Sequence, residues 1–271
     1  MKLNLFDSHV HTDNSFDGTH SLTYLCECGV EKGIMGLAVT DHYDCDRVEE
    51  FGLDVRLRQC LFDIQRTRRS FEGEIRIATG IELGQGHRFP EIARYALSQA
   101  EFDVVLGSVH DLEDGRDIMD INFNDPHVVV SQVLTTYYQE ILEMIRWGQF
   151  DVLAHLGYPE RTIWGKYRIP VHLTPFRPLI DEILRELIRQ EKALEVNTRT
   201  LRQTVAKTIP HREVLARYRE LGGRLITLGS DAHRVEDLAA GFDVAMDQLL
   251  ELGYTEFCFY KNRQPVMLRL L

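Results

Sequence analysis

The sequence predicts an α/β protein whose parallel strands close into a barrel, and three observations lead to this prediction. Short apolar segments rich in β-branched residues recur along the 271 residues, and amphipathic segments lie between several of them. This alternation favours a parallel sheet covered by helices. No glycine-rich phosphate loop follows an early strand, because Gly84-Gln85-Gly86 carries only part of that pattern, and this disfavours an open, doubly wound sheet.

Eight apolar segments are the candidate strands, and the stretches between them supply the helices. The segments are 3–11, 34–42, 75–83, 102–110, 150–157, 193–198, 224–233 and 257–260. Residues 131–149 and 174–192 carry apolar side chains three and four positions apart, as one face of a helix requires. Residues 47–69 are charged and helical in pattern, which predicts a covering helix with a solvated face. No linker or repeat divides the chain, so we expect one domain over residues 1–271.

The acidic composition narrows the possible partners. The chain has 42 acidic and 31 basic residues, and its formal charge of −11 repels phosphate backbones and anionic membranes. A nucleic-acid partner is therefore disfavoured, and a small molecule is expected. No apolar run reaches the roughly 18 to 20 residues of a membrane span, and the opening MKLNLFDSHVH turns polar too early for a signal peptide. We expect a cytoplasmic protein without membrane association, and the sequence gives no prediction of its oligomeric state.

The cysteines indicate reduced thiols rather than disulfides or a thiolate metal site. They are five in number and form no CxxC pair: Cys26, Cys28, Cys45, Cys60 and Cys258. Cys26 and Cys28 fall two apart in the predicted helix 23–33, where they do not face each other. Zinc-finger and thioredoxin-like sites are therefore disfavoured.

Polar side chains end strand after strand in the same way. A single histidine at a strand end is usually a hydrogen-bonded rim residue, but here the pattern repeats along the chain. The residues are His9 and His11 with Asp17 shortly after, then Asp41-His42, Glu82, His110, His155, and Asp231 with His233. In a parallel barrel all these ends meet at the C-terminal rim, where the active sites of such barrels lie. Residues far apart in sequence therefore converge on one site.

The residue types at these strand ends indicate metal binding. Strand alternation places His9 and His11 on one side of the sheet, and it does the same for Asp231 and His233. Imidazole and carboxylate ligands without thiolates suit zinc, iron or manganese. Nine candidate ligands exceed what one ion takes, so we expect more than one. Neighbouring ions bridged by a carboxylate such as Glu82 favour hydrolysis of a phosphoryl or acyl group.

The same motifs, taken in order, resemble those of the PHP (polymerase and histidinol phosphatase) family. They are HVH, Asp17 within SFDG, TDH, GIE, GSVH, AHLG, EVNT and GSDAH. The resemblance covers almost the whole chain and is closer to the stand-alone histidinol-phosphate phosphatases than to the versions embedded in polymerases. It implies a distorted (β/α)7 barrel of the TIM type, with a trinuclear metal centre at the C-terminal rim. The segment 257–260 is then an extra or edge strand.

The resemblance also implies how the ligands divide among two to three divalent ions. One ion takes His9, His11, Glu82 and Asp231; a second shares Glu82 and adds His110 and His155; a third takes Asp17, His42 and His233. Some relatives have histidine where this chain has Asp17. The carboxylate makes that position harder, which favours manganese or iron there.

From these residues and the resemblance we expect hydrolysis of a small phosphate monoester by direct attack of a metal-activated hydroxide, without a phosphoenzyme. The leading substrate is L-histidinol phosphate, cleaved to histidinol and phosphate in histidine biosynthesis. The expected catalytic residues are Glu82, His42, His233 and Arg161. A metal-bound water or His233 is expected to protonate the leaving group, because the other rim histidines serve as ligands.

Substrate-binding residues are sought among charged side chains near the rim. Arg161 follows the fifth strand and Arg199 the sixth, and a guanidinium fork suits the phosphate oxygens. The ammonium and imidazole of histidinol phosphate require acceptors. The loop after the fourth strand offers Asp111, Glu113 and Asp114, of which Glu113 is the first candidate.

Several alternatives compete with this interpretation. A PHP phosphoesterase could act on another ester such as a nucleotide phosphate. A TatD-like metal-dependent deoxyribonuclease shares the HxH pair and the bridging glutamate, but it does not require Asp17, His42 and His233. An amidohydrolase with a carbamylated lysine lacks its lysine at a middle strand end here. A closed structural metal site, which is usually mononuclear, does not account for nine ligands at an open rim.

Overall fold

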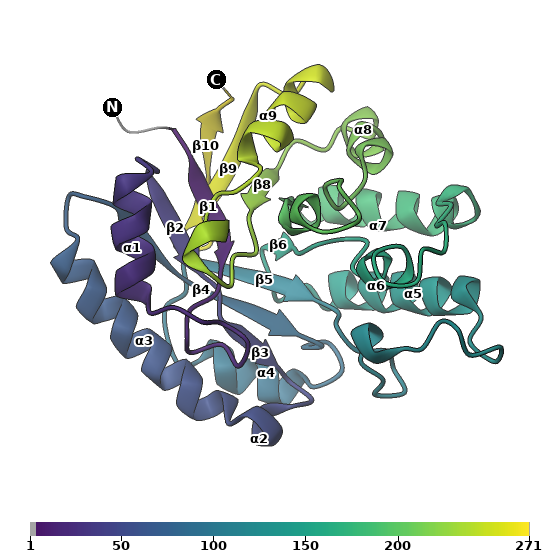
Figure 1. Ribbon diagram of the computed structural model, residues 1–271, viewed down its shortest axis with the longest axis horizontal. Coiled ribbons are helices and arrows are strands. Elements are labelled where there is room, and N and C mark those ends of the chain that lie inside the picture. Colours follow the sequence, from purple (N-terminus) through teal and green to yellow (C-terminus); the bar gives the residue numbers. More distant parts are fainter. Residues whose placement is uncertain (1–3, 271) are drawn as a thin grey trace.

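A mainly parallel sheet organises the protein, as the computed structural model of the chain shows for residues 4–270 (Figure 1). Seven strands follow one another in the order β1-β2-β4-β5-β6-β7-β8, and all neighbours in this path are parallel. Their bounds are Phe6–Val10 (β1), Gly36–Val39 (β2), Arg76–Gly84 (β4), Val104–Ser108 (β5), Val152–Leu153 (β6), Ala193–Asn197 (β7) and Ile226–Gly229 (β8). The first seven predicted strands are thereby present.

The last strand of this path returns to the first, so the sheet is a nearly closed barrel. The backbone N–H of Asp231, just after β8, donates to the carbonyl of His9 at 2.9 Å. The N–H of His11 donates to the carbonyl of Ala232, also at 2.9 Å. The predicted barrel is confirmed. Candidate metal ligands lie at the ends of the two strands that close it, His9 and His11 at the end of β1 and Asp231 and His233 just after β8.

The predicted strand 34–42 is interrupted in the structure. Both β2 and a short strand β3 (His42–Asp44) pair with β4, β2 along its first half and β3 along its second. Between them, the carboxylate of Asp41 turns toward the loop after β1 and accepts hydrogen bonds from the N–H and hydroxyl of Thr12, at 2.6 and 2.7 Å. Asp41 therefore fixes the loop that leads to Asp17.

Helices surround the sheet (Figure 1). The α-helices are α1 (Leu22–Glu31), α2 (Val48–Phe51), α3 (Leu53–Ser70), α4 (Pro90–Leu97), α5 (Val130–Trp147), α6 (Glu160–Ile163), α7 (Arg177–Arg189), α8 (Arg212–Glu220) and α9 (Phe242–Glu251). Short 3₁₀ turns are η1 (Ile118–Asp120), η2 (Thr174–Phe176), η3 (Arg199–Arg202) and η4 (Val235–Asp237). The helices predicted at 131–149 and 174–192 are α5 and α7. The charged stretch 47–69 forms α2 and α3, separated at Gly52 by a left-handed residue (φ 62°).

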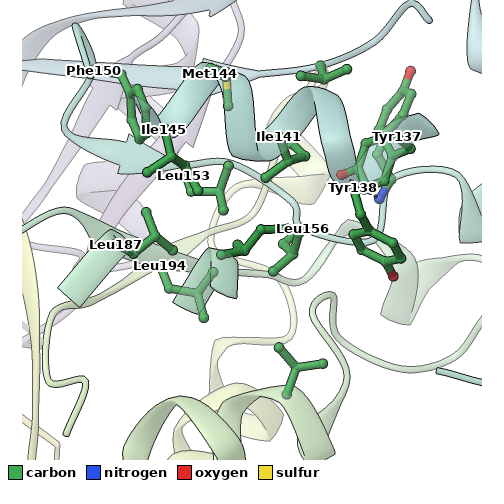
Figure 2. Close-up of a cluster of buried hydrophobic side chains, with 14 of the residues drawn as sticks. Tyr137, Tyr138, Ile141, Met144, Ile145, Phe150, Leu153, Leu156, Leu187 and Leu194 are labelled. Carbon is green, nitrogen blue, oxygen red and sulfur yellow. Dashed lines mark hydrogen bonds between the residues drawn. The ribbon is translucent and has the colours of Figure 1, made fainter. Parts of the chain in front are cut away.

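The largest apolar core lies between the sheet and these helices. Figure 2 shows Ile141 and Ile145 of α5 and Leu187 of α7 together with Leu153 of β6 and Leu194 of β7, and all five are fully buried. Alternate residues of β6 and β7 face the helices here, so the others face the barrel interior.

A second, two-stranded antiparallel sheet covers the N-terminal end of the barrel. It consists of β9 (Glu256–Lys261) and β10 (Gln264–Arg269). The ring of Phe259 stacks on that of Phe6 with centroids 4.4 Å apart. The predicted strand 257–260 is therefore an extra strand outside the barrel path. Strand β10 was not predicted, because its residues are mostly exposed and include Pro265, so they carry no buried apolar run.

Within residues 4–270 no helix is both long and apolar enough to cross a membrane.

Candidate metal centre

Glu82 lies at the middle of the polar cluster at the C-terminal rim. It is at the C-terminal end of β4, is 1% exposed, and points into the barrel mouth. Imidazole nitrogens of five histidines lie between 2.7 and 3.5 Å from its two carboxylate oxygens: His9, His11, His42, His110 and His155. Side chains from four strand ends thus converge on one carboxylate, an arrangement that suits the predicted bridging role.

Four overlapping groups of three residues have donor atoms close enough to share an ion, all within 4.8 Å of one another. They are His9, His11 and Asp231; His9, Glu82 and His155; His42, Glu82 and His110; and His11, His42 and His233. The first and last groups resemble the predicted first and third ion sites. The structure differs from the predicted division in bringing His42 close to Glu82 and His110 as well.

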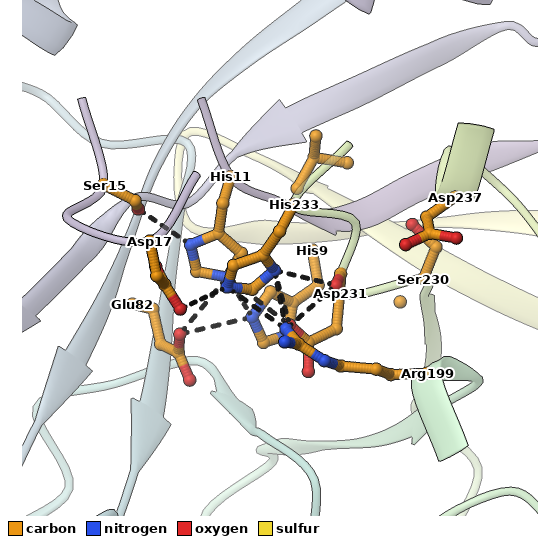
Figure 3. A network of polar contacts seen from close by, with 12 residues as sticks. His9, His11, Ser15, Asp17, Glu82, Arg199, Ser230, Asp231, His233 and Asp237 are labelled. Atoms are coloured by element: carbon orange, nitrogen blue, oxygen red, sulfur yellow. Dashed lines mark hydrogen bonds and ion pairs between the residues drawn. The ribbon is translucent and has the colours of Figure 1, made fainter. Parts of the chain in front are cut away.

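Asp17 and His233 form the outer edge of the cluster (Figure 3). The Nε2 atom of His233 lies 2.9 Å from Oδ2 of Asp17, and the Nε2 atom of His42 lies 3.7 Å from Oδ1. The Asp17 side chain is 39% exposed, whereas that of Glu82 is fully buried. All nine predicted ligands therefore lie in one cluster that is open to solvent on the Asp17 side.

The residues present fit a group of divalent cations. The Oε2 atom of Glu82 is buried and has no hydrogen-bond partner among the described residues, although three imidazole nitrogens lie nearby. The Nε2 atoms of His9 and His11 face each other at 3.0 Å, where only one of them can carry the shared proton. Buried polar atoms are nearly always satisfied in folded proteins. Cations between these lone pairs would satisfy them.

The electrostatics of the cluster favour an ionised Glu82. Burial by itself would raise the pKa of this carboxyl group, but the neighbouring His42, His9 and His110 hold it well below its usual value. The pKa values of His11 and His9 are shifted in opposite directions. Burial lowers the pKa of His11, helped by His233 and His42, whereas at His9 the carboxylates of Glu195 and Glu82 outweigh burial and raise it. Glu82 is close to both histidines, and the additional carboxylate of Glu195 distinguishes His9 from His11.

Two buried carboxylates beside this cluster were missed from the sequence. Glu195 in β7 lies 2.7 Å from Nδ1 of His9, and Asp44 in β3 lies 2.7 Å from Nδ1 of His110. The alternation of side chains along a strand could have indicated both residues. Glu195 is two residues before Asn197 in a predicted buried strand, and Asp44 is two residues after His42, so alternation places each on the interior side.

Both predicted phosphate-binding arginines lie beside Asp231. Nη1 of Arg199 is 2.8 Å from Oδ1 of that carboxylate and 2.6 Å from Nδ1 of His233. Nη1 of Arg161 is 3.7 Å from Oδ2, and its guanidinium lies 5.0 Å from the centroid of the Tyr158 ring. The Arg161 side chain is only 8% exposed, yet its Nε has no partner among the described residues. Arg161 is therefore a buried cation with capacity for an anion.

Glu113 lies apart from this cluster. It is exposed and lines a surface cleft of about 520 Å³ together with Arg116 and His127. The loop that carries it turns back on itself, and the backbones of Asp111 and Asp117 form an isolated antiparallel bridge. The N–H of Ile118 donates to the carbonyl of His110 at 3.0 Å. Of the acidic residues in this loop, Asp111 and Asp117 are therefore the ones next to the rim.

Comparisons with known proteins agree with this geometry. The chain is 28% identical over 250 residues to a probable histidinol-phosphatase of Clostridium acetobutylicum, covering 89% of this chain and 91% of the relative. It is 27% identical to a histidinol-phosphatase of Lactococcus lactis, covering 84% and 83%. The crystal structure of the histidinol phosphate phosphatase of Lactococcus lactis, in complex with zinc, L-histidinol and phosphate, superposes with a TM-score of 0.85 at 24% identity, over 98% of this chain and 100% of that one.

A family comparison identifies the chain more directly. The model of the PHP domain matches residues 7–199, which carry seven of the nine predicted ligands and both arginines. The resemblance noted in the motifs is thus confirmed, and so is the barrel fold. The enzyme class predicted from the sequence, a metal-dependent phosphatase, agrees with these matches. The chain belongs to the PHP domain family.

Proposed function

We propose that the protein is a phosphatase that depends on two to three divalent ions and hydrolyses L-histidinol phosphate to histidinol and phosphate, a step of histidine biosynthesis. One observation carries the proposal: a buried carboxylate with an unpaired oxygen, surrounded by five imidazoles, lies next to two arginines that share Asp231. Such a site combines cation ligands with anion-binding side chains. Four curated relatives, each matched over most of its length, are named histidinol-phosphatase or probable histidinol-phosphatase. Membership of the PHP family does not support the alternative of a TatD-like deoxyribonuclease.

The nine residues His9, His11, Asp17, His42, Glu82, His110, His155, Asp231 and His233 would hold the ions. Manganese, iron or zinc bound there would lower the pKa of a water molecule and neutralise negative charge on the phosphate. The division among three ions remains a prediction, as does the identity of the metal.

The remaining steps fall to the side chains of this chain. Arg161 and Arg199 would bind the phosphate oxygens that face away from the ions, because a guanidinium offers paired donors to a tetrahedral anion. Nδ1 of His233 lies between the Nη1 donor of Arg199, at 2.6 Å, and the carbonyl oxygen of Asp231, at 3.0 Å, and the other ring nitrogen is Nε2. That atom faces Asp17 at the open edge. Nε2 serves either as a ligand or as the proton donor to the leaving alcohol, not as both at once.

The cationic end of the substrate would contact Asp117. This side chain is 29% exposed and its nearest cation, Arg47, is 3.8 Å away, while Arg47 forms its close ion pair with Asp111 at 2.9 Å. The turn of the loop places Asp117 next to His110; its Oδ1 accepts the N–H of Met119 at 2.8 Å, whereas its Oδ2 has no closer cation than Arg47 among the described residues. Glu113 remains the candidate from the sequence, but its exposed position makes it the weaker of the two.

The function is tested with a panel of phosphate esters and the purified protein loaded with manganese, zinc or iron. We expect the highest kcat/KM for histidinol phosphate. Asp117→Asn should raise KM for that substrate about tenfold, about 1.4 kcal/mol, and leave KM unaffected for an alkyl phosphate that carries no cationic group. Glu113→Gln tests the other candidate in the same loop and should leave KM near the parent value. A preference for nucleoside phosphates would replace the proposed substrate, and no hydrolysis of any ester would refute the phosphatase.

A further inference from the structure

Glu195 connects two of the proposed ligands through its two oxygens. Oε1 lies 2.7 Å from Nδ1 of His9, and Oε2 accepts the backbone N–H of His155, also at 2.7 Å. Asn197 donates its side-chain amide to the same Oε2 at 3.2 Å. Glu195 is fully buried, and these three partners of its carboxylate are all nitrogens able to donate. Only a side chain with two accepting oxygens, such as an ionised carboxylate, can accept hydrogen bonds from all three donors.

The hydrogen bond from the N–H of His155 to Glu195 also bears on the backbone conformation of His155. His155 has a positive φ of 26°, an unusual conformation for a residue with a side chain. The hydrogen bond from its N–H to Glu195 holds the backbone in that conformation and so directs the imidazole toward Glu82, where Nε2 lies 2.7 Å from Oε1. Strained backbone of this kind persists where the surroundings fix it.

Asp44 makes a similar contact on the other side of the cluster. Its Oδ1 lies 2.7 Å from Nδ1 of His110, and it is 4% exposed. The Nε2 atom of His110 then faces Glu82 at 3.2 Å. At His9 the arrangement is the same, with Nδ1 on a carboxylate and Nε2 at 3.3 Å from Glu82.

Both carboxylates occupy space that a neighbouring glycine leaves open. A Cβ atom on Gly229 would lie 2.0 Å from Oε1 of Glu195, and one on Gly84 would lie 1.9 Å from Oδ1 of Asp44. Any other residue at either glycine would displace the carboxylate from its histidine. The strands next to these acids are thus shaped to admit them.

We propose that Glu195 and Asp44 are positioning residues that hold the Nδ1 protons of His9 and His110, so that both histidines present Nε2 to the ions. The inference rests on the proposed metal centre and is independent of which phosphate ester is cleaved. A carboxylate behind a ligand histidine fixes its ring and tautomer and makes it a stronger ligand. The Nδ1 atoms of His42 and His155 lack hydrogen-bond partners within the described structure, so this orientation is selective.

The two acids differ in how replaceable they are. In Glu195→Gln one oxygen becomes an NH2 group. If the remaining oxygen serves the two donors His155 and Asn197, the NH2 donates to Nδ1 of His9 and moves its proton to Nε2, where a metal cannot bind. In Asp44→Asn the amide can turn its oxygen toward His110 and keep that hydrogen bond. We therefore expect the larger loss at Glu195.

Zinc affinity, measured by competition with a chromophoric chelator and without substrate, tests this proposal. We expect Glu195→Gln to weaken zinc binding about 10- to 100-fold and Asp44→Asn less than about tenfold. Glu140→Gln is the matched control, because Glu140 is a buried carboxylate 2.8 Å from His87, outside the cluster. In the zinc-loaded protein, nitrogen-15 NMR should show a hydrogen-bonded Nδ1 proton on His9 and His110, and Glu195→Gln should lose the one on His9.

Wild-type zinc affinity in a folded Glu195→Gln protein would overturn the proposal, as would an equal loss in Glu140→Gln. If Glu195→Gln does not fold, Asp44→Asn decides through the His110 proton, which must persist together with most of the affinity. A protein that binds zinc as expected but hydrolyses no phosphate ester would leave this inference standing and refute the proposed function instead.

Discussion

The two ends of the barrel are built from the same strands but have opposite chemistry. Along β4 the interior position Ala78 belongs to an apolar cluster, and Glu82, four residues later, is the centre of the polar one. Along β5 the interior positions begin with Val104 and Leu106, and His110 follows beyond the strand end. At the N-terminal end β9 covers this apolar interior, whereas at the C-terminal end the polar cluster faces solvent.

The covered end therefore contributes mainly to stability, and the polar end carries the candidate site. Burying apolar side chains at the covered end stabilises the fold in proportion to area and leaves no polar atom unpaired. Burying Glu82 and its histidines costs free energy unless partners or cations compensate them. Substitutions at the two ends should therefore separate a loss of turnover from a loss of stability, and each prediction below tests that separation.

The largest effect is expected from Glu82→Gln. The change removes the charge that five histidines surround, so we expect metal loss and a fall in turnover of at least about 10⁴-fold, about 5.4 kcal/mol. Activity on alkyl and aryl phosphates, metal content and thermal unfolding are the measurements. Full activity would end the metal-centre interpretation.

At the covered end, Phe259→Ala should lower the free energy of unfolding by about 3 to 5 kcal/mol. Phe259 is 3% exposed and loses its stacking on Phe6 in this variant. Turnover per folded molecule should stay within about twofold of the parent well below the melting temperature. Denaturant unfolding and single-temperature kinetics measure the two quantities. A variant that is stable but inactive would show that the two ends are coupled.

A smaller effect is expected from Arg161→Ala, about 100-fold in kcat/KM or about 2.7 kcal/mol. The buried guanidinium is expected to bind phosphate, and metal content should be retained because Arg161 is not a ligand. Arg94→Ala, at an exposed arginine of α4, is the control. An unchanged kcat/KM would remove Arg161 from the substrate site, and loss of metal would assign it a structural role at Asp231.

The sequence alone predicted the barrel and the meeting of the nine candidate ligands. Both follow from regular geometry: parallel strands end on one rim, and alternate residues share a face. Local sequence patterns do not indicate which side chains form hydrogen bonds with each other across the fold. Nothing near Glu195 in sequence indicates His9, which is 186 residues away. Likewise the break at Asp41 depends on Thr12, a contact made only in the folded chain.

Loop residues were harder still to predict. Glu113, Asp114 and Asp117 are all acidic residues of one loop, and only the return of that loop onto His110 distinguishes them. The positive φ values of His155 and Asp231, 26° and 52°, were also beyond sequence reasoning, because residues with a side chain rarely adopt them.

The hairpin of β9 and β10 has a consequence for the order of events in turnover. Because its packed aromatic side chains cover one end of the barrel, we expect substrate and products to use the open side beside Asp17 at the other end. If Arg161 and the ions bind the phosphate product as proposed, phosphate would lie deeper than the alcohol and would leave after it. The next substrate would then wait for phosphate to leave, and accumulated phosphate would compete with substrate for the free enzyme.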